Sequence, residues 1–161
     1  MKPPIDALDA QILSLFGVEP RIGVLEASRR LSVARGTVQA RLDRLESQGV
    51  VTGWGPEVDP VALGFEVSAF VTLEISQRGH RMIETALAQL PEVLEAHTTS
   101  GSGDMIVRVV ARTNADLQRV VDAVLTIDGV ERSNMVIVLA NGVPYRTTPL
   151  LERAAGERGI T

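Results

Sequence analysis

The chain has 161 residues, of which 45% are hydrophobic, with a formal net charge of −4 and no cysteine. It can bury one or two cores, and disulfide frameworks, thiolate zinc sites and cysteine nucleophiles are excluded. No apolar run approaches the ~20 residues of a membrane helix, and the N-terminus lacks the apolar core of a secretory signal, so we expect a cytoplasmic protein with no membrane partner.

The charges are unevenly distributed along the chain. Residues 1–52 carry seven basic and six acidic groups, a balance of +1, whereas residues 53–161 carry nine and fourteen, a balance of −5. Between Ser28 and Arg44, five arginines accompany one acid, Asp43. The two parts are therefore expected to have different partners.

Three short helices are predicted before residue 49. Apolar residues at helical spacing mark a first helix over 6–16, which Asp6 caps, and a second over 24–31. Residues 17–23 connect these two helices, and a turn over 32–34 leads to a third helix over 34–48. Apolar stripes that face one another make this a three-helix domain of the helix-turn-helix type.

The third helix carries the candidate DNA-binding residues. Val38, Leu42 and Leu45 form its apolar stripe, and the opposite face is assigned Thr37, Arg41, Arg44 and Gln48. Guanidinium groups match both phosphates and the guanine edge. The predicted DNA contacts are Arg35, Thr37, Gln39, Arg41, Arg44 and Gln48, and the alternative is a merely solvated helix face.

A hinge is predicted after the third helix, which Gly49 is expected to end because a left-handed residue is least costly there. Residues 50–54 are predicted as a short β run, with Trp54 as an anchor of the hinge. The predicted organisation is a helix-turn-helix domain over 1–49, a hinge and β linker over 50–62, a second domain over 63–142 and a C-terminal tail over 143–161.

The second domain has the order βαββαβ. Strands are predicted over 67–75, 93–100, 105–112 and 130–140, and helical periodicity covers 82–90 and 117–127. This order predicts an α+β, ferredoxin-like fold, an antiparallel sheet with both helices on one face. Apolar residues assigned to the other face predict self-association: Phe70, Ile106, Val110, Ile137 and Leu139.

The Gly101–Asp104 loop has two interpretations. It is a hairpin whose glycines supply positive φ, or its bare N–H groups hold a ligand carboxylate while Asp104 receives an ammonium group. Both can hold, and we hypothesise that an amino acid binds there. His97 is interpreted as a packing residue, and we expect no catalytic residue, no metal site and no cofactor.

The sequence resembles a known family in two segments. ALDAQIL and ARGTVQARLDRLESQGVVTGW, between Asp6 and Trp54, precede a βαββαβ domain that contains HTTSGSGDMIVRV. Together these resemble the Lrp/AsnC family of feast/famine transcriptional regulators over about residues 5–142. Where that family usually has glycine in the turn and a serine cap before the third helix, this chain has Ser32 and Ala34.

The resemblance implies a winged-type helix-turn-helix that binds double-stranded operator DNA and a C-terminal regulation-of-amino-acid-metabolism domain. It also implies a homodimer that assembles to a tetramer or octamer, with exchanged hinge strands and effectors between subunits. The last strand, where the family often has two threonines, carries Ser133 and Met135. The implied effector residues are Thr99, Gly101, Ser102, Gly103, Asp104, Ser133 and Met135.

The favoured function is a sequence-specific transcriptional regulator whose oligomeric state or DNA affinity responds to an amino acid or related small molecule. One alternative is an enzyme like the sirohaem decarboxylases, which share this architecture, although an acidic C-terminal half with two histidines suits a haem-like substrate poorly. The other alternative is an effector-binding partner protein that has lost DNA binding.

Overall fold

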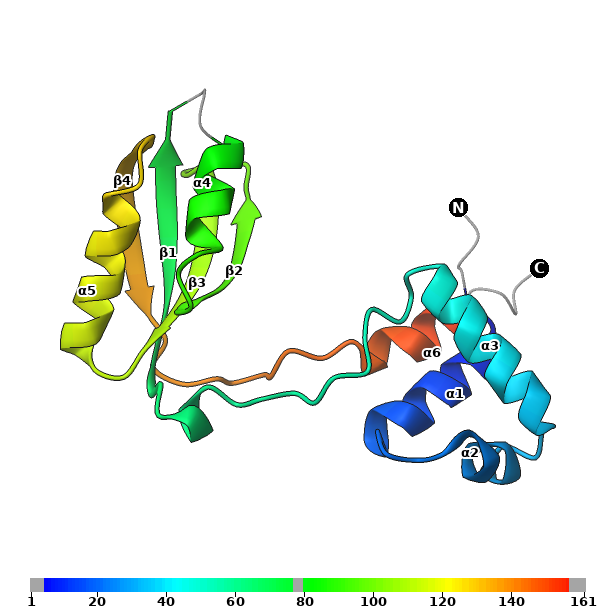
Figure 1. Cartoon of the computed structure of the whole chain (residues 1–161). Helices are drawn as coiled ribbons and strands as arrows, with labels where there is room; N and C mark the ends of the chain where they lie inside the picture. Colours follow the sequence, from blue (N-terminus) through cyan, green and yellow to red (C-terminus); the bar gives the residue numbers. More distant parts are fainter. Residues whose placement is uncertain (1–4, 77–79, 157–161) are drawn as a thin grey trace. The chain divides into compact units, whose positions relative to one another are not determined.

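The computed structural model describes residues 5–76 and 80–156, so residues 1–4 of the predicted first domain and 157–161 of the predicted tail lie outside the described residues. The chain folds as two compact units (Figure 1). Unit 1 is Met1–Pro56 with Val143–Thr161, and unit 2 is Glu57–Gly142. In the parts described, no helix is long and apolar enough to cross a membrane.

The described residues of unit 1 form the helices α1 (Ala7–Val18), α2 (Val24–Arg30), α3 (Arg35–Ser47) and α6 (Thr148–Gly156). The first three confirm the predicted helices. α1 begins where Asp6 accepts a hydrogen bond from the N–H of Asp9, while Asp9 accepts one from the N–H of Asp6. The three helices share a core that contains Ile12, Phe16, Ala27, Val38 and Leu42.

α3 ends as predicted at Gly49, whose φ is +70°. The N–H of Gly49 bonds the carbonyl of Glu46, and the N–H of Val50 bonds that of Leu45, which closes the helix end. The β run predicted over 50–54 is wrong: these residues form no strand. The N–H groups of Val50 and Val51 donate to the carbonyl of Leu45 at the end of α3 and not to a neighbouring strand. Trp54 is an anchor, as predicted: its ring meets Phe16 edge-on at 5.4 Å, and its Nε1–H donates to Glu46 (2.7 Å).

The C-terminal segment is part of unit 1. The prediction of a separate tail over 143–161 is wrong for residues 148–156, which form α6 and pack against α1. Leu151, Ala154 and Ala155 contact a small cluster built from Ile5, Ala10 and Leu45. The sequence pattern of α6 is too short to predict this packing. Its apolar residues pack against helices that lie more than a hundred residues earlier in the chain.

Unit 2 has the predicted element order. After a short 3₁₀ turn, η1 (Val61–Leu63), follow β1 (Val67–Ile75), α4 (His80–Leu87), β2 (Val93–Thr98), β3 (Met105–Ala111), α5 (Asn114–Leu125) and β4 (Val130–Ile137). The sheet order is β2-β3-β1-β4 with every neighbouring pair antiparallel. Both α4 and α5 lie on the same face of the sheet (Figure 1), which confirms the ferredoxin-like fold.

The core of unit 2 lies between the sheet and its two helices. Alternate residues of β1 and β3 face α4 and α5 and are buried, among them Val71, Leu73 and Val107. The intervening residues form the open face of the sheet, which carries Phe70 and Ile106 as predicted; Val110 points to the same side but is buried. This open face mixes apolar with polar side chains.

Two residues assigned to the open face lie elsewhere. Ile137 is paired with Ala69, which is fully buried on the helix side, and directly paired residues point to the same face. Leu139 follows the end of β4 and has no position in the sheet. The register of β4 on β1 decides both assignments, and the apolar pattern of β4 does not contain that register.

Candidate functional sites

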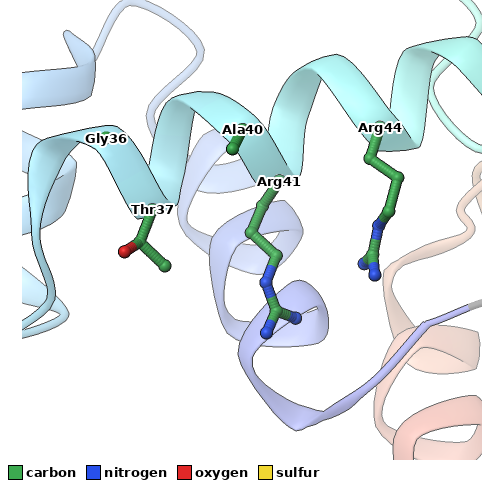
Figure 2. A pocket seen from close by; sticks show the side chains of 5 residues that line it. All are labelled: Gly36, Thr37, Ala40, Arg41 and Arg44. Atoms are coloured by element: carbon green, nitrogen blue, oxygen red, sulfur yellow. The ribbon is translucent and has the colours of Figure 1, made fainter.

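α3 presents two different polar surfaces. Its buried stripe is Val38, Leu42 and Leu45, as predicted. Exposed residues along the rest of this helix form what we call the outer face of α3: Arg35, Gly36, Gln39, Ala40 and Asp43. Thr37, Arg41 and Arg44 are only half-buried and line one flank of the helix, where their side chains point to the same side (Figure 2).

Arg41 and Arg44 were expected on an open face that meets DNA, and that expectation is corrected, because both are half-buried and held by acids near the start of α1. Arg41 donates through Nη1 to Asp6 Oδ2 and to Asp9 Oδ1, the latter at 2.9 Å, and Arg44 donates through Nη2 to Asp9 Oδ2. The side chain of Asp9 is completely buried, whereas those of Arg41 and Arg44 are 27% and 38% exposed. The first turn of α1 thus holds both arginines, an arrangement that we call the arginine clamp. A pattern within α3 cannot reveal acids on another helix.

The arginine clamp changes the ionisation of Asp6. Burial by itself would raise the pKa of this carboxyl, but hydrogen bonds from Arg41 and from the N–H of Asp9 outweigh it and lower the pKa from 3.8 to about 2. The same contacts, with Asp6 and then Asp9, raise the pKa of Arg41. Both pKa shifts favour the charged forms, so the ion pair of Asp6 with Arg41 is charged throughout the physiological range.

Asp6→Asn should make the stability of unit 1 less dependent on pH. Asparagine keeps the cap of α1 and loses the charge, so we expect the free energy of unfolding to fall by about 1–2 kcal/mol at pH 7. Because folding lowers the pKa, this contribution is complete above pH 3.8 and is lost as the pH falls to about 2. Urea unfolding followed by Trp54 fluorescence checks it. A wild-type advantage that persists at pH 2 would contradict the assignment.

Most of the arginines counted in the sequence are paired inside unit 1. Arg30 contacts Glu19 and Glu26, and Arg29 lies 3.7 Å from Glu26. Arg35, the first residue of α3, has no ion pair among the described residues. The positive charge that is free to meet a phosphate is thus smaller than the sequence count indicates.

The remaining predicted DNA contacts lie at different places on α3. Gln39, on the outer face, donates through Nε2 to Asp43 Oδ1 at 2.7 Å. Gln48 is the exposed C-cap residue of α3, at the far end from Arg35. The structure therefore brings Arg35 and Gln39 together on one exposed surface and separates Gln48 from them.

The Thr99–Asp104 loop is closed by its own hydrogen bonds and by β1. The N–H of Thr99 donates to the carbonyl of Asp104 and its hydroxyl to that of Gly103, both at 2.9 Å. One carboxylate oxygen of Asp104 accepts the N–H of Ile75 at 2.8 Å. Gly101 has a φ of +130°, as the hairpin interpretation requires. Asp104 thus ties the loop to the end of β1.

A hollow of about 270 Å³ lies beside this loop on unit 2, close to the lower end of the ~300–1,000 Å³ range of small-molecule sites. It is lined by Thr72, Glu74, Ser102, Arg132, Ser133 and Asn134. Ser102 and Ser133 belong to the predicted effector set and meet here. Met135 does not: it is paired with Val71 and packs against the core of unit 2.

Sequence reasoning missed four residues of this hollow. Thr72 and Glu74 alternate with the buried residues of β1, and that alternation could have shown them on the open face. Arg132 and Asn134 are paired with Glu74 and Thr72, which follows from the register of β4 and has no signal in the sequence. Asp6 and Asp9, the partners of the arginine clamp, were missed for the same kind of reason.

Each of the two units matches a known protein family model. Residues 5–46 match the model of the AsnC-type helix-turn-helix domain, and residues 68–148 match that of the Lrp/AsnC ligand binding domain. The chain belongs to the Lrp/AsnC family. It is a transcriptional regulator with a helix-turn-helix DNA-binding domain and a ligand-binding domain, and the named members it resembles are transcriptional regulators and not enzymes.

Members of the Lrp/AsnC family match over most of the chain. HTH-type transcriptional regulator FL11 of Pyrococcus horikoshii is 28% identical, covering 86% of this chain and 92% of that protein. An HTH-type transcriptional regulator of Pyrococcus furiosus is 34% identical over 84% and 91%. The structure of Escherichia coli AsnC, at 28% identity, has a TM-score of 0.83 and covers 90% of this chain and 99% of its own.

A regulator from Neisseria meningitidis, solved as a complex with L-methionine, shares the fold at 22% identity, with a TM-score of 0.80 over 89% of this chain and 95% of its own. These matches confirm the resemblance seen in the sequence.

The start of α3 lacks a side-chain cap. Ser32, in the turn, has a φ of +55°, and Ala34 is an N-cap whose side chain makes no hydrogen bond. Ala34→Ser should satisfy a first-turn N–H and stabilise unit 1 by ~0.5–2 kcal/mol. The check is urea unfolding read from Trp54, with Ala40→Ser, an exposed mid-helix site, as the control. An Ala34→Ser variant no more stable than that control would contradict the assignment.

Proposed function

We propose that this chain binds operator DNA in a sequence-specific manner through the outer face of α3. The observation that carries the proposal is an exposed face of α3 in a helix-turn-helix, with Gln39 on it and with Arg35 outside every ion pair of the described residues. An exposed helix of this kind fits the major groove, which is about 12 Å wide. Arg35 supplies the phosphate or guanine contact, and Gln39 faces the base edges.

The proposal gives a smaller role in DNA binding to the other predicted contacts, Thr37, Arg41, Arg44 and Gln48. Arg41 and Arg44 are engaged by Asp6 and Asp9, so a phosphate contact would have to replace or share those bonds. Their main contribution is to hold α3 on α1 in the orientation that exposes Arg35. A matching change in both stability and affinity is therefore expected for substitutions at these two arginines.

Arg35→Ala tests the phosphate part of the proposal. Without the Arg35 guanidinium, the protein should bind all sequences more weakly, and the slope of log K against log salt should become shallower by about one unit per phosphate no longer neutralised. Fluorescence anisotropy with DNA at several salt concentrations measures this slope. Arg81→Ala, an exposed arginine of α4 in unit 2, is the matched control. Equal slopes for the two variants would contradict the role of Arg35.

We propose further that an amino acid or related small molecule binds beside the Thr99–Asp104 loop and alters oligomeric state or DNA affinity. Two charges of the hollow, Glu74 and Arg132, lie 3.9 Å apart. They match the ammonium and carboxylate groups of a free amino acid, and the relatives solved with L-methionine make amino acids the first ligands to test. A ligand shifts assembly or affinity only as far as it prefers one state.

Calorimetric titration of the full chain with every proteinogenic amino acid tests the ligand, and sedimentation velocity with and without the ligand found tests the response. Binding heat for at least one amino acid, with a change in sedimentation or DNA affinity, is expected. Flat titrations throughout would refute the ligand proposal.

The open face of the unit 2 sheet, with Phe70 exposed, is the surface proposed for the homodimer and for its assembly to a tetramer or octamer.

A further inference from the structure

The outer face of α3 carries one ordered polar pair. Gln39 and Asp43 lie one turn apart, both exposed, and the amide Nε2 of Gln39 donates to Asp43 Oδ1 at 2.7 Å. Because a carboxylate is only an acceptor, this bond fixes which end of the amide is the NH₂ group. The amide oxygen and the second N–H of Gln39 stay free for a partner.

A glutamine amide with a free oxygen and a free N–H can form a pair of hydrogen bonds with one base edge in the major groove, that of adenine. Adenine presents N7 as an acceptor and N6–H₂ as a donor in the major groove, and an amide oxygen and N–H satisfy both together. The same pair of groups does not match guanine, whose N7 and O6 are both acceptors. An amide already held in position by Asp43 loses less side-chain entropy when it binds.

Two neighbours of Gln39 on α3 have small side chains or none. Gly36 and Ala40 flank it on the outer face, and a Cβ added to Gly36 would meet nothing within 4 Å. Packing inside the protein therefore does not explain this glycine, although glycine costs a helix about 1 kcal/mol relative to alanine. Among the five residues drawn in Figure 2, Gly36 and Ala40 are the two without a polar side chain, and both are exposed.

We infer that Gln39 reads an adenine in each half-site and that Asp43 is its positioning residue. The inference rests on the proposed function, sequence-specific DNA binding, and names the base contact within it. Asp43 also places a negative charge on the surface that meets DNA. It therefore disfavours non-specific contact with phosphates, and the penalty is offset only where Gln39 finds its base.

Selection of randomised duplex DNA by the full chain tests the inference. The wild type should select an adenine at one position in each half-site, and Gln39→Ala should lose that preference alone, weakening binding to the selected site by roughly 5- to 100-fold. Gln118→Ala is the matched control, because Gln118 makes the same bond to Asp122 (2.8 Å) on α5 of unit 2. Both substitutions are at exposed sites, and Trp54 fluorescence checks that unit 1 stays folded.

Variants of Asp43 separate its hydrogen bond from its charge. Asp43→Asn keeps an acceptor oxygen, so the adenine preference should remain while affinity for unrelated DNA rises. Asp43→Ala removes the acceptor, so the preference should weaken, and a merely structural role would not produce this difference. The inference is overturned if Gln39→Ala keeps every wild-type base preference, or if Asp43→Ala and Asp43→Asn select alike. A wild-type chain that selects no sequence overturns the proposed function itself.

Discussion

Asp9→Ala is expected to destabilise unit 1 by about 3 kcal/mol, a large effect for a single substitution. Asp9 is fully buried and accepts from Arg41, Arg44 and the N–H of Asp6. Its removal leaves the partly enclosed guanidinium of Arg44 without a counter-charge and that of Arg41 with Asp6 alone. Losing one member of a buried ion cluster costs more than the cluster contributes, because a partner charge is left unpaired.

Urea unfolding followed by Trp54 fluorescence measures this loss. Trp54 is the only tryptophan of the chain and contacts both α1 and α3 through Phe16 and Glu46, so its signal reports unit 1. Asp43→Ala, which removes an exposed acid from the same helix system, is the control and should stay within about 0.5 kcal/mol of the wild type. An Asp9→Ala variant as stable as the control would show that the arginine clamp contributes nothing.

Gly103→Ala is expected to destabilise unit 2 by about 1–3 kcal/mol. A Cβ at this position would lie 2.2 Å from Cγ2 of Thr72 and 3.3 Å from the carbonyl oxygen of Leu73. The loop cannot retreat freely, because Asp104 bonds Leu73 through its N–H and Ile75 through its carboxylate. The same shift would disturb the hollow that Ser102 lines, so ligand affinity should fall with stability.

Thermal unfolding followed by circular dichroism measures the effect, since a change of 1 kcal/mol moves the Tm of a domain this size by about 4–8 °C. Thr72→Ser removes the clashing Cγ2, so the double variant with Gly103→Ala should recover most of the lost Tm relative to Thr72→Ser alone. Gly142→Ala, where an added Cβ meets nothing within 4 Å, is the control. No recovery in the double variant would contradict the steric explanation.

The elements of this fold follow from local sequence signals. The alternation of β1 places Val71 and Leu73 on the helix face, and the spacing of Val38, Leu42 and Leu45 gives the buried stripe of α3. Both patterns predict burial directly, because the position of a residue within the repeat of a helix or strand decides which face its side chain occupies. The capped start of α1 and the left-handed Gly49 are equally local.

The features that the sequence did not reveal are tertiary. Arg41 and Arg44 have a charged pattern typical of a solvated or DNA-contacting face, but their partners are on α1, 32 or more residues earlier. Ile137 and Met135 depend on the register of β4 against β1. The candidate sites were therefore predicted as segments, α3 and the Thr99–Asp104 loop, while the side chains that face a ligand depend on packing between elements.

The most direct test of the account is binding of the full chain to the DNA upstream of its own gene, by fluorescence anisotropy at several salt concentrations, beside an unrelated duplex of equal length. The account predicts binding that exceeds the unrelated control by ~10³ or more. Weak binding that is equal on both duplexes and vanishes with modest salt would leave only the non-specific electrostatic contribution. That result would contradict a sequence-specific regulator and favour an effector-binding partner protein.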